Sequence, residues 1–118
     1  MRIFVGHDST QPENTAVCVR SIERFGHKVT LLDKKDLQRD HGYKRKKEDG
    51  STEFTYTRFL VPYLCGYKGK AMFCDSDFVW RKDPAILDRL VGDAPVTVVK
   101  HLIKQVREDH KFLSHKNE

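Results

Sequence analysis

Short apolar runs with β-strand character alternate with helix-like stretches along most of this chain. The strand-like runs span residues 2–6, 28–32, 70–75 and 95–100, and the helix-like stretches span 12–25, 57–65 and 84–91. Parallel strands need a long crossover between them, usually a helix, so this alternation is typical of a mainly parallel sheet. We therefore expect an α/β fold, a Rossmann-like and mainly parallel sheet flanked by helices, in which residues 70–75 form the central strand.

Local signals support several of these boundaries. Gly26 directly follows the 12–25 stretch, and glycine commonly ends a helix. Asp83 and Pro84 are suited to the N-cap and the first helical position of the 84–91 stretch. Pro62 should disturb the helix at 57–65, because it has no N–H to donate. At 118 residues, the chain is predicted to form a single domain, residues 1–118.

Two acidic residues, Asp75 and Asp77, flank Ser76 at the end of the 70–75 run, with apolar residues on both sides. An ionised carboxylate in an apolar run is costly unless a cation or hydrogen-bond donors compensate it. In an extended segment the two side chains would share a face, roughly 6–7 Å apart along the backbone. Oxygen ligands at this spacing suit Mg²⁺ or Mn²⁺, which commonly bind through one or two carboxylates together with substrate phosphates. The alternative is a solvated acidic turn.

The residues before the acidic pair carry a more specific pattern. Tyr56 and Arg58 form an aromatic-x-Arg motif at the start of a helix-like stretch, a glycine-containing connection follows, and the apolar strand then ends in D-x-D. This order resembles the nucleotide-sugar half of GT-A glycosyltransferases, particularly glycosyltransferase family 8, the glycogenin and lipopolysaccharide galactosyltransferase kind. The strand at 2–6 and the turn after it also resemble that family. Together the matches cover residues 2–32 and 53–100.

The resemblance implies a glycosyltransferase domain of GT-A type that binds a nucleotide diphosphate sugar, with a UDP-sugar favoured, through Mn²⁺ or Mg²⁺. The resemblance implies that Asp77 is the main metal ligand and that Asp75 shares the ion or contacts the ribose. Asp8 would accept the imide N–H of uracil, and His7 belongs to the same turn. Ser76 is small enough to let the sugar or ribose approach the backbone.

Two of these residues also have ordinary structural roles open to them. Arg58 offers a planar fork of donors for phosphate or for a carboxylate of the acidic pair, but it is also suited to a plain surface position. Asp8 is followed by Ser9 and Thr10, and all three residue types commonly cap a helix such as the one expected at 12–25.

Family members continue past this point into a region that binds the acceptor and supplies a metal-binding histidine. Residues 101–118 hold three histidines but not the family's histidine motif. We therefore expect the donor-binding half, incomplete for transfer to an acceptor, and the acceptor itself cannot be read from the sequence. The apolar residues at 102, 106 and 113 have helix-like spacing, so docking on the sheet or on a second copy in a homo-oligomer is open.

Positive charge is concentrated in residues 34–47, which hold seven basic and two acidic residues. We interpret 33–52 as a long polar loop, because no apolar period runs through it. Its charge would attract a diphosphate, an anionic lipid surface or nucleic acid, or would simply be solvated. Only Tyr43 supplies an aromatic ring within 34–47, so nucleic acid is not expected as a partner.

The three cysteines, Cys18, Cys65 and Cys74, are odd in number, lack metal-type spacing and have apolar neighbours. They predict buried, reduced thiols. No apolar run approaches the roughly 18 residues of a membrane span, and no signal-peptide pattern is present. We therefore expect no transmembrane segment and a cytoplasmic protein.

Two other classes remain open. The segment 73–79 also fits the pattern of haloacid-dehalogenase-like phosphohydrolases, in which Asp75 would be the nucleophile and Asp77 the general acid/base. That fold places the motif near its start and needs a later lysine and acidic cluster. The other class is a non-catalytic anion- or nucleic-acid-binding module that acts through residues 34–47. Salt-sensitive binding that survives loss of both aspartates would identify it.

Overall fold

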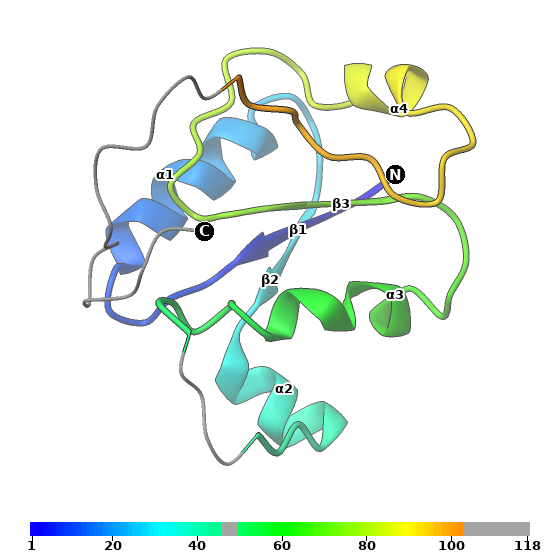
Figure 1. Cartoon of the computed structure of the whole chain (residues 1–118). Helices are drawn as coiled ribbons and strands as arrows, with labels where there is room; N and C mark the ends of the chain where they lie inside the picture. Colours follow the sequence, from blue (N-terminus) through cyan, green and yellow to red (C-terminus); the bar gives the residue numbers. More distant parts are fainter. Residues whose placement is uncertain (46–49, 103–118) are drawn as a thin grey trace.

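The computed structural model describes residues 1–45 and 50–102 as a three-stranded sheet packed between helices (Figure 1). The strands are β1 (Arg2–Gly6), β2 (Val29–Leu32) and β3 (Ala71–Cys74). The helices are α1 (Pro12–Glu23), α2 (Lys34–His41), the 3₁₀ turn η1 (Thr57–Leu60), α3 (Val61–Leu64) and α4 (Ile86–Leu90). The α/β fold class predicted from the alternation of strands and helices is confirmed.

The strand order is β2-β1-β3, and both pairings are parallel. Phe4 of β1 lies opposite Thr30 on one side and Phe73 on the other, so β1 is the central strand of the described sheet. The prediction that residues 70–75 form the central strand is wrong. Burial gives the reason: four of the five residues of β1 are buried, whereas in β3 only Cys74 is.

Alternate side chains of β1 enter two separate cores, because successive residues of a strand point to opposite faces. Ile3 and Val5 pack against Ile22 of α1. Phe4 packs on the other face against Val61 of α3. Figure 1 shows α1 and α3 on opposite sides of the strands. Full burial of an apolar side chain contributes about 1.5–3 kcal/mol, and Phe4 and Val5 are both fully buried, so β1 organises both layers.

The predicted loop at 33–52 contains the helix α2, so that prediction is wrong for its first half. The Asp33 side chain caps the helix by accepting a hydrogen bond from the backbone N–H of Lys35 at 2.9 Å. Gly42 ends the helix in the left-handed conformation, with φ of 66°. Leu37 is the one buried residue of α2. One buried apolar residue cannot give a helical repeat of apolar positions in the sequence. The capping residues Asp33 and Gly42 were therefore the only sequence signal for this helix.

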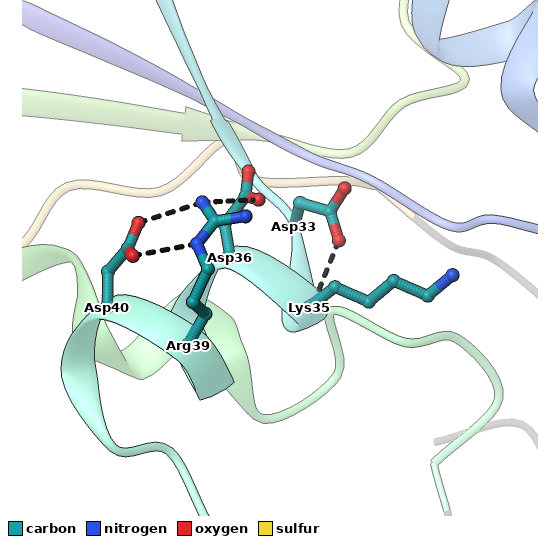
Figure 2. Close-up of polar contacts among 5 residues, drawn as sticks. All are labelled: Asp33, Lys35, Asp36, Arg39 and Asp40. Atoms are coloured by element: carbon teal, nitrogen blue, oxygen red, sulfur yellow. Dashed lines mark hydrogen bonds and ion pairs between the residues drawn. The ribbon is translucent and has the colours of Figure 1, made fainter.

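Ion pairs on the surface of α2 engage part of the charge that made the segment look like a solvated loop. Figure 2 shows the Arg39 guanidinium between two carboxylates, 3.1 Å from Asp36 and 2.8 Å from Asp40. This pairing holds the pKa of the Asp40 carboxyl below its usual range. Lys46 and Lys47, which belong to the same basic run, lie outside the described residues.

Residues 95–100 form no strand within the described ranges, and that prediction is wrong. Val96, Val98 and Val99 are 79%, 79% and 72% exposed. β-branched side chains favour a strand because they pack on a half-buried pleated surface, and these side chains have no such surface.

The remaining helices are shorter than predicted. α4 covers the middle of the 84–91 stretch, preceded by a turn in which the Asp83 carboxylate accepts the backbone N–H of Ala85 at 2.9 Å. The 57–65 stretch divides into η1 and α3, with Pro62 in the first turn of α3, so the predicted disturbance is present. Of the C-terminal segment, residues 103–118 lie outside the described residues.

Candidate functional site at the carboxyl edge of the sheet

The carboxyl ends of β1 and β3 lie side by side, because Val5 pairs with Cys74 in parallel register. The turn with His7 and Asp8 therefore begins beside the acidic residues that follow β3. Ligands of open parallel α/β sheets bind at this edge, beyond the carboxyl ends of the strands. The two predicted parts of the site thus emerge from neighbouring strands.

The acidic pair lies in a turn rather than on a strand. β3 ends at Cys74, and the carbonyl of Asp75 accepts the backbone N–H of Phe78 at 3.4 Å. The spacing expected for an extended segment therefore does not apply to the two carboxylates. Ser76 is buried and Asp77 is exposed. The Asp77 carboxylate makes no hydrogen bond or ion pair to another described residue, so it is open to a ligand.

Arg58 reaches the acidic turn from η1, on the α3 side of the sheet. Its Nη2 lies 3.5 Å from Oδ1 of Asp75, and both side chains are partly exposed. Its Nε donates a hydrogen bond to the carbonyl of Phe54 at 3.2 Å, and its guanidinium lies 5.1 Å from the ring centre of Phe73. Exposed ion pairs stabilise a fold by at most about 1 kcal/mol, so this contact chiefly fixes the positions of the Arg58 and Asp75 side chains. It places a guanidinium beside the predicted phosphate site.

Asp8 is buried, and its carboxylate is already engaged. Oδ1 accepts the backbone N–H and the hydroxyl of Thr10, at 3.0 and 2.6 Å, and Oδ2 accepts the backbone N–H of Glu53 at 3.4 Å. Burial alone would raise the pKa of Asp8, but the hydrogen bonds from Thr10 and Glu53 outweigh it, and the pKa is lowered. Asp8 is not the N-cap of α1, which is Gln11; it shapes the turn before the helix. It also ties the segment around Glu53 to the end of β1.

The segment at 50–56 is a part of this edge that the sequence did not reveal. Glu53 accepts the backbone N–H of Ser9 at 3.2 Å and is also hydrogen-bonded to the Ser9 hydroxyl. Phe54 is buried and packs so closely on Gly6 that a Cβ there would lie 2.5 Å from the ring. A glycine at the end of a buried strand was the available signal, since glycine in a strand often marks a close approach by another segment.

His7 points to α1 rather than to the acidic turn in its one described side-chain contact. Its Nδ1 lies 3.0 Å from the hydroxyl of Thr15, and the pair is partly buried. The structure therefore gives His7 a role in fixing the start of α1 against the sheet.

Two free thiols lie behind the acidic turn. The sulfurs of Cys18 and Cys74 are buried and 3.9 Å apart, and the Cys18 thiol also donates to the carbonyl of Asp75 at 3.7 Å. The hydrogen bond to Cys74 and burial raise the pKa of Cys18. The hydrogen bond from the Cys18 thiol outweighs burial and lowers the pKa of Cys74. The predicted burial is confirmed for Cys18 and Cys74, which are free thiols in the structure, whereas Cys65 is only partly buried.

The donor set at this edge is two carboxylates. Within residues 1–45 and 50–102, no group of three or more His, Cys, Asp or Glu side chains gathers in a metal-binding arrangement. A dedicated structural zinc site would need about four protein ligands. One exposed and one partly exposed carboxylate are the kind of oxygen ligands through which Mg²⁺ or Mn²⁺ binds together with phosphate oxygens and water. Separately, the described part of the chain contains no helix long and apolar enough to cross a membrane.

Fold and site together define an α/β domain with an acidic turn and a facing arginine at the carboxyl edge of its sheet. This chain is similar to Protein CDI of Arabidopsis thaliana, with 35% identity over 113 residues. The match covers 92% of this chain and 41% of the Arabidopsis protein, so the chain spans less than half the length of that relative. No family model and no solved structure matches the chain.

Proposed function

We propose that this chain is the donor-binding domain of a GT-A glycosyltransferase of the family 8 kind. It binds a nucleotide diphosphate sugar, with a UDP-sugar favoured, at the edge formed by β1 and β3. Asp75, Ser76, Asp77 and Arg58 contact the donor, and Asp8 holds the neighbouring turn in place. The pair of buried free thiols fits the reducing, cytoplasmic location that we propose for the protein.

The observation that supports this proposal most strongly is the contact between Arg58 and Asp75. Residues far apart in the sequence bring a guanidinium within 3.5 Å of one carboxylate of the acidic pair, at the edge where parallel sheets bind ligands. Arginine is suited to phosphate because its planar fork can donate two parallel hydrogen bonds. Asp77, the other carboxylate of the acidic turn, is exposed.

Mn²⁺ or Mg²⁺ fits the carboxylates of Asp77 and Asp75, since both are hard oxygen ligands with partly or fully exposed side chains. When bound, such an ion would offset the negative charge of the diphosphate. Arg58 orients the phosphates and keeps Asp75 in place. Ser76 is buried between the two carboxylates, and its small side chain leaves room for the sugar or ribose near the backbone.

Calorimetry with UDP, GDP and ADP, each with and without Mn²⁺, tests this function. We expect UDP to bind best and only with the metal. Asp77→Asn keeps the shape of the side chain but removes its charge, and should weaken metal-dependent affinity by roughly 10- to 100-fold, the range for a lost charge-assisted contact. Asp93→Asn is the matched control, because Asp93 is an exposed aspartate elsewhere on the chain. Flat titrations with every nucleotide would contradict the proposal.

A second candidate function is binding of single-stranded nucleic acid through the basic segment. Tyr43, Lys44 and Arg45 line a shallow groove of about 390 Å³ together with Tyr56 and Phe59. The Arg45 guanidinium lies 3.7 Å from the ring centre of Tyr56, and Phe59 is 75% exposed. The fold thus adds aromatic rings to a cationic segment, which is the combination that stacks bases and holds phosphates.

A fluorescent oligonucleotide titrated at several salt concentrations separates the two functions. If the chain binds nucleic acid, Lys44→Ser should reduce the slope of log affinity against log salt concentration by about one. Lys68→Ser, a control at an exposed lysine, should not change this slope. Binding of this kind persists when Asp75 and Asp77 are both changed to Asn. Absence of salt-dependent binding would remove this candidate.

A further inference from the structure

A second groove lies between α1 and the segment that follows the acidic turn. It has a volume of about 570 Å³. Its lining residues come from two elements: Val17, Arg20, Ser21 and Arg24 from α1 and its C-terminal end, and Val79, Trp80 and Arg81 from the segment after β3. None of these residues belongs to the proposed donor site.

The charge of this groove is positive and largely uncompensated. Three arginines and no carboxylate line it. Arg24 donates to the carbonyl of Trp80 at 2.8 Å, but Arg20 and Arg81 form no ion pair with any residue of the described ranges. Arg20 and Arg24 lie four residues apart at the end of α1, a spacing at which like charges on a helix repel each other. A bound anion would relieve this repulsion.

The walls of the groove are apolar and fixed in position. Val17 and Val79 are 54% and 61% exposed, and the half-buried indole of Trp80 lies between the two elements. The backbone N–H of Trp80 donates to the hydroxyl of Ser21 at 2.9 Å, and the Trp80 carbonyl accepts from Arg24. These two hydrogen bonds hold the segment at 79–81 against α1. The groove is therefore formed before any ligand arrives.

We propose that this groove binds a phosphate monoester that carries an apolar or aromatic group. A phosphate monoester carries a charge of about −1.5 to −2 at neutral pH, which matches the uncompensated guanidinium groups of Arg20 and Arg81. Its apolar group covers the exposed side chains of Val17 and Val79 and the part of Trp80 that lines the groove. The proposal is independent of the donor site and needs no divalent metal.

Trp80 lines this groove and is the chain's one tryptophan, so its fluorescence responds to a ligand that binds there. The purified chain is titrated with phenyl phosphate in EDTA, which keeps divalent metals from the donor site. Inorganic phosphate tests the anion alone, and phenol tests the apolar group alone. We expect a saturable change with phenyl phosphate, binding of inorganic phosphate at least tenfold weaker, and no saturable change with phenol.

Variants locate the site. Arg20→Ser and Arg81→Ser should each weaken phenyl phosphate binding by about tenfold, the low end of the range for one lost charge-assisted contact, because both side chains are exposed. Arg89→Ser, an exposed arginine outside the groove, should leave it unchanged. Both target arginines are exposed, and circular dichroism checks that the variants fold. No saturable response in the folded parent, or equal affinity in the parent and both variants, would overturn the proposal.

The source of the phosphate monoester is distinguished by a phosphotyrosine peptide in the same assay. A peptide that binds more than tenfold tighter than phenyl phosphate identifies a phosphorylated protein side chain, and equal affinity identifies a small ester. Both results support the groove as a phosphate monoester site. Inorganic phosphate that binds as tightly as phenyl phosphate would overturn the apolar part of the assignment.

Discussion

Gly6→Ala tests whether the close contact between β1 and the 50–56 segment organises the carboxyl edge. A Cβ at this position would lie 2.5 Å from Cγ and 2.8 Å from Cδ2 of Phe54. Gly6 does not adopt a positive φ, so backbone strain does not contribute. Reduced freedom of the unfolded chain favours alanine by about 0.4–1 kcal/mol, but overpacking typically costs about 1–3 kcal/mol. The steric term wins, and we expect net destabilisation of about 1–2 kcal/mol.

Urea unfolding measures this change, and the double variant shows its cause. Phe54→Ala alone should be strongly destabilising, because it removes a buried ring. Adding Gly6→Ala to that background should cost little, because the ring atoms that clash are gone. The Phe54 carbonyl accepts from Arg58, so Gly6→Ala should also weaken nucleotide binding. A Gly6→Ala variant as stable as the parent, or equal costs in both backgrounds, would refute this reasoning.

Three further predictions concern single side chains. Asp33→Ala removes the cap on Lys35 and should destabilise α2 by about 1 kcal/mol, seen as faster amide hydrogen exchange confined to that helix. Asp8→Asn should destabilise most near neutral pH: because the folded pKa of Asp8 is lowered, its contribution is complete above the unfolded value, near 3.9, and is lost as pH falls through the folded value. Unfolding midpoints of both forms should therefore converge in acid. Ser21→Ala leaves the backbone N–H of Trp80 without its partner. It should lower the free energy of unfolding in urea by about 1–3 kcal/mol and change the tryptophan emission.

The elements with strong apolar patterns could be predicted from the sequence. β1 is apolar and buried after its first residue, Arg2, and α1 has proline in its first turn and Gly26 just beyond its end. By contrast, α2 has one buried residue and depends on its caps. Residues 95–100 show the opposite error, because a strand-like composition does not supply a neighbouring strand. A sequence pattern indicates which secondary structure a segment favours. Whether that structure forms depends on contacts with the rest of the chain.

The sequence pointed to several residues of the candidate site but not to their geometry. The D-x-D pattern located Asp75 and Asp77, and the chemistry of Arg58 suggested a carboxylate partner, which is Asp75. No spacing rule could show that the strand ends before Asp75, so that the pair lies in a turn. Glu53 was not predicted, because its hydrogen bonds to Ser9 join segments far apart in the sequence.

The acidic turn is held from both layers of the fold. On the α1 side, the Cys18 thiol donates to the carbonyl of Asp75, and Ser21 accepts the N–H of Trp80. On the α3 side, Arg58 contacts the Asp75 carboxylate. The positions of the carboxylates therefore depend on packing on both faces of the sheet, not on the turn alone. Preorganisation of this kind lowers the entropic cost of ordering side chains when a ligand binds. The segment after β3 also contributes to both the proposed donor site and the groove beside α1. A change that loosens Trp80 should therefore weaken ligand binding at both places.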